Sequence, residues 1–196
     1  VVVTSDAGAG VGYTGIRIRG TDPTRINVTL NGIPVNDSES HGVFWVNMPD
    51  LASSLDNIQV QRGVGTSSNG ATAFGASLNM QTNRLNRKWY VDLVNGYGSF
   101  NTWRNSIAGG SGLIADHFTL DARLSRISSD GYIDRATSEL MSLYVSGAYH
   151  GKKTLVRFNV ISGLEETYQS WYGTPEAAPD TNRTYNYYTY ENQVDH

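Results

Sequence analysis

The sequence lacks cysteine, is poor in proline and contains no long apolar run. The absence of cysteine excludes disulfides and thiolate metal sites. No stretch approaches the roughly 18 consecutive apolar residues that a membrane-spanning helix requires. The net charge of -3 provides no basic surface, so we expect no nucleic-acid partner. The mean hydropathy of -0.37 resembles that of a soluble chain, but membrane β-strands, whose side chains alternate, also keep a low average.

Glycine and tyrosine are abundant instead, with 21 and 12 residues in a chain of 196. This composition favours strands, turns and interfacial aromatic residues over helical packing. The first residues, Val1 to Thr4, have the pattern of a strand and not that of a signal peptide. We therefore expect an internal piece of a longer precursor, which an intact mass equal to that of the 196-residue chain would contradict.

Residues 1–84 combine short strand patterns, turns and one helix pattern, so we expect a small α/β domain. Ile16 to Arg19 alternates apolar and basic residues, as a strand with one buried face does. Asn27 to Val35 predicts a hairpin around Asn31-Gly32, because both turn residues tolerate positive φ. Pro49 to Leu55 begins with the proline and acidic residue of a helix start. Leu55 to Gln61 then alternates again, with its apolar residues on one side.

Residues 85–196 have a different pattern, which predicts antiparallel strands. Residues alternate between two faces over Phe118 to Ser125, Leu143 to His150 and Leu155 to Ile161, with one face mainly apolar. Trp89 to Tyr97 and Trp103 to Leu113 show the same alternation more weakly. Each segment approaches the length of about 9 to 11 residues that a tilted membrane strand needs. We therefore expect a second domain, from residue 85, made of the first strands and exterior loops of a transmembrane β-barrel.

The connections between these segments differ in length, which favours a membrane barrel over a soluble β-sandwich. Ala115-Asp116 and Gly151 to Lys153 read as tight turns, whereas Ser128 to Glu139 and the residues after Glu165 are long and polar. Outer-membrane barrels have short periplasmic turns and long exterior loops. Closed single-chain barrels need at least about eight strands, so we expect the rest of the barrel beyond His196 or missing.

Six features of residues 19–82 occur in a fixed order: Arg19-Gly20, Arg25, Leu30 to Pro34, Arg62-Gly63, Phe74-Gly75 and Thr82. In this order and spacing the stretch resembles the plug domain of the TonB-dependent outer-membrane receptor family. The family's usual Asp before the hairpin Gly is Asn31 here, and Asp56 and Gln59 stand where two Glu are common. The Gly-Gly pair before the last strand appears as Gly75-Ala76.

The resemblance implies a mainly β protein, in which a plug gates a barrel of about 22 strands. It also implies energised import across the bacterial outer membrane. The implied partners are the TonB–ExbB–ExbD complex, outer-membrane lipids, a small-molecule ligand such as a ferric siderophore and a surface lipoprotein. The TonB box that would contact TonB lies N-terminal to the plug in this family and is not in this chain.

The resemblance further implies that an arginine of the plug locks it to Glu residues of the barrel wall. Arg62 is the first candidate and Arg25 the second, because a guanidinium stays charged and forms bidentate bonds. A simpler alternative is that Arg62 pairs with Asp56 inside the plug.

Catalytic and cofactor patterns are weak, so we expect no enzyme, no cofactor and no metal site. Gly10 to Gly15 matches G-x-G-x-x-G, but a strand follows it where a dinucleotide site needs a helix. Asp37, Glu39 and His41 would share a face of an extended segment, yet a polar exposed loop explains them better. Ser67 and Ser68 lack the G-x-S-x-G context of a nucleophile.

Two segments are candidates for ligand contact because they place aromatic rings beside hydrogen-bonding groups. They contribute Ser38, Glu39, His41, Phe44 and Trp45 from the first domain, and Gln169, Trp171 and Tyr172 from an exterior loop rich in further tyrosines. Packing in the plug core is the alternative for Phe44 and Trp45. For the tyrosines, the alternative is an aromatic girdle or contacts between loops.

These contacts suit a scarce ligand of the siderophore-iron, haem or cobalamin type. An importer of oligosaccharide or peptide is one alternative, and an extracellular carbohydrate-binding β-sandwich is another. A channel without energy coupling and an NAD-dependent enzyme are further rivals.

Overall fold

The computed structural model describes residues 1–63, 74–82, 85–168, 170, 172 and 174–190. Its first part, residues 1–82, is called the N-terminal unit below. This unit contains a two-stranded hairpin, a four-stranded sheet of order β4-β3-β6-β5 and three 3-10 turns. The elements are β1 (Val2–Ser5), β2 (Thr14–Arg17), η1 (Pro23–Arg25), β3 (Ile26–Leu30), β4 (Ile33–Pro34), η2 (Trp45–Asn47), η3 (Leu51–Ser54), β5 (Asn57–Arg62) and β6 (Ala76–Gln81).

The predicted hairpin of the N-terminal unit is confirmed. Asn31 and Gly32 connect β3 to β4 with φ angles of 53° and 83°, the positive values that a tight two-residue turn requires. The side chain of Asn31 also reaches the end of β6, where it accepts a hydrogen bond from the Thr82 backbone N–H at 2.9 Å. The same amide donates to Thr82 Oγ1 at 2.9 Å, so the turn is tied to the last strand of the sheet.

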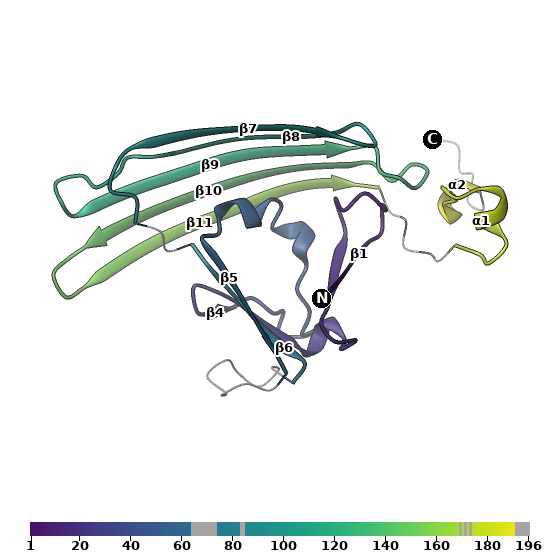
Figure 1. Ribbon diagram of the computed structural model, residues 1–196, viewed down its shortest axis with the longest axis horizontal. Helices are drawn as coiled ribbons and strands as arrows, with labels where there is room; N and C mark the ends of the chain where they lie inside the picture. Colours follow the sequence, from purple (N-terminus) through teal and green to yellow (C-terminus); the bar gives the residue numbers. More distant parts are fainter. Residues whose placement is uncertain (64–73, 83–84, 169, 171, 173, 191–196) are drawn as a thin grey trace.

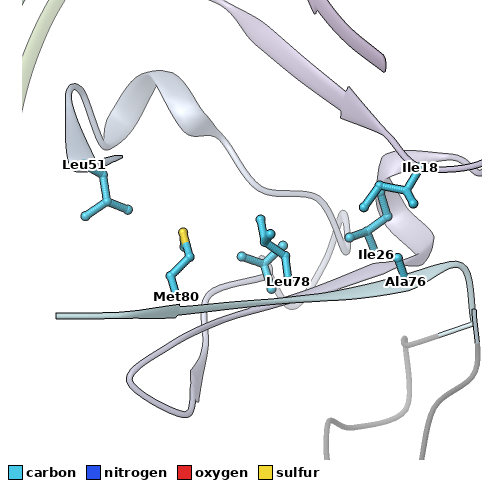
Figure 2. Close-up of a cluster of buried hydrophobic side chains, with 7 residues drawn as sticks. Ile18, Ile26, Leu51, Ala76, Leu78 and Met80 are labelled. Atoms are coloured by element: carbon cyan, nitrogen blue, oxygen red, sulfur yellow. The ribbon is translucent and has the colours of Figure 1, made fainter. Parts of the chain in front are cut away.

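The apolar core of the unit lies on one face of its sheet and is formed mainly by β3 and β6. It contains Ile18, Ile26, Val28, Leu51, Ala76, Leu78 and Met80 (Figure 2). The apolar residues of β5, Ile58 and Val60, are 50% and 43% exposed, because β5 is the edge strand beyond this core. The predicted helix near Pro49 is the single 3-10 turn η3. β2 begins at Thr14, inside the Gly10 to Gly15 motif, so a strand and not a helix follows its glycines, as predicted.

The second part is an antiparallel sheet of five strands in sequential order, called the wall sheet below. Figure 1 shows that the strands form a curved sheet with the N-terminal unit on its concave side. The strands are β7 (Tyr90–Gly98), β8 (Thr102–Gly110), β9 (Phe118–Ser129), β10 (Ser138–His150) and β11 (Leu155–Thr167). The predicted five strands are therefore confirmed. Residue 84 is outside the described residues, so the domain boundary between 84 and 85 stays a prediction.

The two faces of the wall sheet differ in polarity. The outward face carries exposed apolar side chains, among them Leu93, Ile107, Leu124 and Leu143, which are register partners across four strands. The concave face carries small polar residues such as Ser125, Ser142 and Ser146, which are buried. This is the alternation that the sequence predicts. The β-sandwich alternative needs a second sheet on this concave face, where the described residues place the N-terminal unit instead.

The predicted contrast in connection length is only partly correct. At one end of the sheet, β9 is joined to β10 through residues 130–137, and at the other, β10 is joined to β11 through 151–154, as predicted. The expectation of long loops at one end fails for the β7–β8 connection, which lies at that end but has only residues 99–101. The β8–β9 connection, 111–117, contains the tight turn at Ala115-Asp116, but residues 111–113 leave the ladder before it.

Two short helices follow β11 among the described residues, α1 (Ala178–Thr181) and α2 (Tyr187–Tyr190). No helix in the described part of the chain has the length and apolar character needed to cross a membrane.

Candidate functional site between the N-terminal unit and the wall sheet

Asp50 is the main polar contact of the N-terminal unit with the wall sheet. It precedes the 3-10 turn η3 and has a left-handed backbone, with φ 53° and ψ 24°. Its Oδ1 accepts from Nη2 of Arg104 at 2.7 Å, and its Oδ2 accepts from Nη1 of Arg123 at 2.6 Å. The side chains of Asp50 and Arg123 are only 5% and 6% exposed, whereas that of Arg104 is 44% exposed. One buried carboxylate therefore joins the unit to two strands of the wall.

Two serines of η3 complete this polar cluster. Ser53 donates to Oδ1 of Asp50 at 2.7 Å and accepts a hydrogen bond from Arg104. Ser54 accepts from Nε of Arg123 at 2.9 Å. The cluster contains two guanidinium groups and one carboxylate, so it keeps one excess positive charge. Since a buried charge is stable only when it is paired and hydrogen-bonded, Asp50 is the residue on which the cluster depends.

Close packing against β11 also holds the segment around Asp50 against the wall sheet. A Cβ atom added at Gly163 would lie 2.6 Å from Cδ of Pro49 and 3.0 Å from the carbonyl oxygen of Asn47. Arg157, also on β11, donates from Nη1 to the carbonyl oxygen of Thr82 at 2.8 Å. The wall thus approaches the unit on both sides of Asp50 in the chain.

A polar cavity of about 750 Å³ lies beside this cluster. The N-terminal unit and the wall sheet both line it, and Arg123 of the Asp50 cluster forms part of its surface. Its lining includes Ser54, Asp56 and Thr82 from the unit and Asp121, Tyr144, Ser146 and Arg157 from the wall. Within the residues that the structure describes, no three His, Cys, Asp or Glu side chains are grouped to hold a metal ion.

A second contact joins the β1–β2 connection to the 130–137 connection of the wall. The carbonyl oxygen of Ala7 accepts from the backbone N–H of Tyr132 at 2.8 Å and from that of Ile133 at 3.3 Å. The hydroxyl of Ser170 donates to the carbonyl oxygen of Asp6 at 2.7 Å. The N-terminal unit is therefore held at the long-loop end of the wall as well as at Asp50.

The structure places the predicted ligand contacts of the first domain in different surroundings. Ser38, Glu39 and His41 are exposed on a turn and not on an extended segment. Phe44 is 54% exposed, whereas its neighbour Trp45 packs partly buried against the core of the unit. Packing in the core of the unit, the alternative to ligand contact, therefore applies to Trp45 and not to Phe44.

The carboxylate of Asp37 organises that turn. Its Oδ2 accepts from the backbone N–H of Ser40 at 2.7 Å and from that of Glu39 at 3.2 Å. The hydrogen bonds from the backbone and the side chain of Ser40 lower the pKa of Asp37 below its ordinary value.

The predicted contacts after β11 are described only in part. Gln169 and Trp171 lie outside the described residues. Tyr172 is 60% exposed and lies in a cluster of three tyrosine rings. Its ring centroid is 4.7 Å from that of Tyr187 and 5.4 Å from that of Tyr188.

Arg62 and Arg25, the predicted locking residues, are both exposed, and among the described residues no ion pair to the wall is found for either. Their locking role stays a prediction. Sequence reasoning missed the cluster of Asp50, Arg104 and Arg123. The available signal was Arg123 itself, a charged residue at a concave-face position of an otherwise regular strand pattern.

Comparisons with known proteins agree with this architecture. The family model described as TonB-dependent Receptor Plug Domain matches residues 1–77. No curated protein sequence matches the chain. Among solved structures, the pyoverdine outer membrane receptor FpvA from Pseudomonas aeruginosa PAO1, bound to pyoverdine, matches with a TM-score of 0.64 and 17% identity. That match covers 78% of this chain and 23% of the receptor.

Two further solved structures show the same fold. The copper transporter OprC matches with a TM-score of 0.66 and 16% identity over 81% of this chain and 25% of its own. The siderophore receptor PirA from Acinetobacter baumannii matches with a TM-score of 0.61 and 15% identity over 81% and 26%. The chain therefore spans about a quarter of the length of these proteins.

Proposed function

The chain belongs to the TonB-dependent receptor family through the plug domain in its first 77 residues, and from this premise we infer that it is part of an outer-membrane importer. Members of this family are receptors and transporters, not enzymes. One observation carries the proposal. The N-terminal unit lies on the polar face of a sheet whose opposite face is exposed and apolar, as a plug against the inner wall of a membrane barrel would.

The dimensions of the apolar face support a membrane location. Aromatic pairs lie at two levels of the outward face, Phe118 with Tyr149 at 5.2 Å and Tyr97 with Trp103 at 4.6 Å between ring centroids. The polar Asn95, Asn105 and Arg126 lie between the apolar part of this face and the second pair. Trp103 is the register partner of Ser128 on β9, the strand that begins at Phe118. The ten steps from Phe118 to Ser128, at about 3.3 Å each and a tilt of about 40°, separate the two aromatic levels by roughly 25 Å along the membrane normal. This is the height of the apolar band of outer-membrane barrels.

In the proposed mechanism, the N-terminal unit closes the barrel and must loosen for the ligand to pass. The Asp50 cluster is a suitable seat, because it holds the unit to β8 and β9 through charges that are costly to separate. TonB, driven through ExbB and ExbD, would pull on a segment N-terminal to the plug and so load this seat. Arg62 and Arg25 remain candidates for a second lock elsewhere on the wall.

We propose a ferric siderophore as the ligand, with haem and cobalamin as related candidates. FpvA is a pyoverdine outer membrane receptor and PirA a siderophore receptor, while OprC is a copper transporter. The exposed ring of Tyr172, with Tyr187 and Tyr188 beside it, offers aromatic faces to a planar chelate at the long-loop end. The other proposed contacts are Ser38, Glu39, His41, Phe44, Trp45, Gln169 and Trp171.

Growth of a deletion strain on single iron sources tests the import of iron. We expect lost growth on one ferric siderophore and recovery with the intact gene. A surface lipoprotein partner, if it contributes, would copurify with the receptor. Normal growth on every iron source, with a defect on an oligosaccharide, would replace this ligand class with the alternative one.

A variant of Tyr172 tests the ligand contact separately. Tyr172→Ala should weaken ligand binding by up to about tenfold, since a stacked ring contributes roughly 0.5 to 1.5 kcal/mol. Tyr172→Phe is the control because it keeps the ring and removes the hydroxyl. Equal loss in both variants would assign the effect to the hydroxyl and not to stacking.

A further inference from the structure

The two wall arginines of the Asp50 cluster depend on one short segment of the N-terminal unit. Within the residues that the structure describes, every side-chain hydrogen bond of Arg104 and Arg123 goes to residues 50–54. Nη2 of Arg104 binds Asp50 and Ser53. Nη1 of Arg123 binds Asp50, and its Nε binds Ser54. If this segment withdraws from the wall, both guanidinium groups therefore lose all of these partners at once.

Arg104 also has a donor that the cluster does not use. Its Nε is buried and has no hydrogen-bond partner among the described residues. Its side chain is nevertheless 44% exposed, so solvent reaches the rest of the group. A guanidinium carries five N–H donors, of which Asp50 and Ser53 use only a part. The cluster thus has hydrogen-bonding capacity beyond its present contacts.

The polar cavity of about 750 Å³ provides room for a ligand beside the cluster. Arg123 and Arg157 both line it. Asp121 and Ser146, which are register partners on β9 and β10, line it as well. Asp121 is two residues nearer than Arg123 to the tight turn before β9. The cavity therefore extends from the cluster toward the short-turn end of the wall.

The wall side of the cluster and cavity remains positively charged when the carboxylate of Asp50 is left out. The carboxylate of Asp121 is bound to the hydroxyl of Tyr90 at 3.0 Å. Together, the wall residues of the cluster and cavity are the cations Arg104, Arg123 and Arg157 and the anions Asp92 and Asp121. Three guanidinium groups and two carboxylates leave one positive charge in excess, which favours an anionic ligand.

We propose that Arg104 and Arg123 form a binding site for a carboxylate group of the imported ligand, which replaces the Asp50 carboxylate when the N-terminal unit loosens. The inference rests on the proposed import function. Each oxygen of Asp50 binds a different arginine, at 2.7 and 2.6 Å, so a ligand carboxylate fits the same donors. The exchange avoids leaving the buried cation Arg123 unpaired, which is costly. A ligand without an anionic group cannot make this exchange.

The test measures binding of ¹³C-labelled acetate to the intact protein in detergent micelles by the broadening of its NMR line. Asp50→Gly removes the competing carboxylate, and glycine tolerates the left-handed backbone of this position. This variant should bind acetate about tenfold more tightly than the unchanged protein, because charge-assisted hydrogen bonds to the arginines become available. Acetamide, which has the same size and no charge, should gain nothing.

A second substitution in the Asp50→Gly background locates the bound acetate. Arg104→Gln should remove the gain, because one of the two donor groups is lost. Arg126→Gln is the matched control, since Arg126 is on β9 like Arg123 but is 57% exposed and paired with Glu139. It should leave acetate binding unchanged. Asp50→Asn keeps the side chain and removes its charge, so a gain in this variant too would show that the charge of Asp50 excludes the anion.

The inference is overturned if neither Asp50→Gly nor Asp50→Asn binds acetate more tightly than the unchanged protein. Equal loss from Arg104→Gln and Arg126→Gln would also overturn it, since a general attraction to the surface would then hold the anion. Acetate binding is measured without transport, so its absence leaves the import function to the growth experiment. Normal growth of the deletion strain on every source would instead overturn import, whatever the acetate result.

Discussion

Asp50 and Arg123 are 73 residues apart in the chain and form an ion pair of 2.6 Å with both side chains almost completely buried. The pair joins the N-terminal unit to the middle strand of the wall sheet. Arg104 binds the other oxygen of the same carboxylate, so Asp50 is shared between two cations. Here the N-terminal unit carries the carboxylate and the wall carries the arginines. In the lock that the sequence resemblance implies, the plug carries the arginine and the wall the carboxylates.

We expect Asp50→Asn to loosen the N-terminal unit from the wall. Asparagine tolerates the left-handed backbone of this position, so the variant removes the charge without adding strain. It leaves two guanidinium groups facing an uncharged amide, and breaking a buried pair in this way costs about 3 to 5 kcal/mol. Urea titration of the intact protein, followed by protease cleavage of the unit, would measure this loss.

Asp116→Asn is the matched control for Asp50→Asn. Asp116 also has a positive φ, 59°, but it is exposed on the turn between β8 and β9. It should change the free energy of unfolding by less than about 0.5 kcal/mol, as surface substitutions usually do. A similar loss in both variants would mean that the Asp50 pairs do not seat the unit.

We expect Gly163→Ala to push the N-terminal unit away from β11. The added methyl would lie 2.6 Å from Pro49 Cδ and 3.0 Å from the Asn47 carbonyl, so the backbone must shift. Overpacking of this kind costs about 1 to 3 kcal/mol. Gly147→Ala on the neighbouring β10 is the control, since its added Cβ would meet nothing nearer than an atom at 4.0 Å. Hydrogen exchange of the Pro49 region should rise in the first variant only.

The fold was largely predictable because its strands depend on local patterns. The alternation over Phe118 to Ser125 has the period of a strand with two different faces, and β9 forms there. The Asn31-Gly32 pair predicts its hairpin for the same local reason. The alternation predicted a strand as far as Leu113, but β8 ends at Gly110. The backbone N–H of Leu113 donates instead to the carbonyl oxygen of Arg87, a partner distant in sequence that no local pattern indicates.

The site was less predictable because it depends on how two parts of the chain meet. Nothing local to Asp50 indicates that its carboxylate faces Arg104 and Arg123, which are 54 and 73 residues further along the chain. The resemblance pointed to Arg62 on β5, but β5 is the edge strand of the unit, outside its core. Arg123 was visible as a concave-face residue of its strand, yet its partner could only come from the assembled structure.

We expect the turn that carries Ser38, Glu39 and His41 to loosen in acid. Hydrogen bonds from Ser40 lower the pKa of Asp37 in the folded protein. A lowered folded pKa means that Asp37 stabilises the turn above the ordinary carboxyl pKa of 3.8, and that this contribution is lost as pH falls through the lowered value. Hydrogen exchange at the Ser40 amide, corrected for its intrinsic pH dependence, should quicken in that range.

Asp37→Asn provides the control for this pH dependence. Its amide oxygen can still accept from the Ser40 and Glu39 N–H groups but does not titrate. Corrected exchange in the variant should therefore not change through this pH range. The same acid-induced loosening in the variant would show that another group controls the turn.

If the apolar outward face contacts lipid, the cost of placing a charge on it should depend on depth in the membrane. Leu143→Arg places a charge in the apolar part of this face, next to its register partner Leu124, and should destabilise the fold in liposomes by about 2 to 4 kcal/mol. Ser128→Arg places the same charge on the outward face beside Glu139, at the level of Trp103. Near the interface an arginine costs only about 0 to 1 kcal/mol. Equal effects of both variants would mean that this face does not contact hydrocarbon, because only a membrane distinguishes their depths.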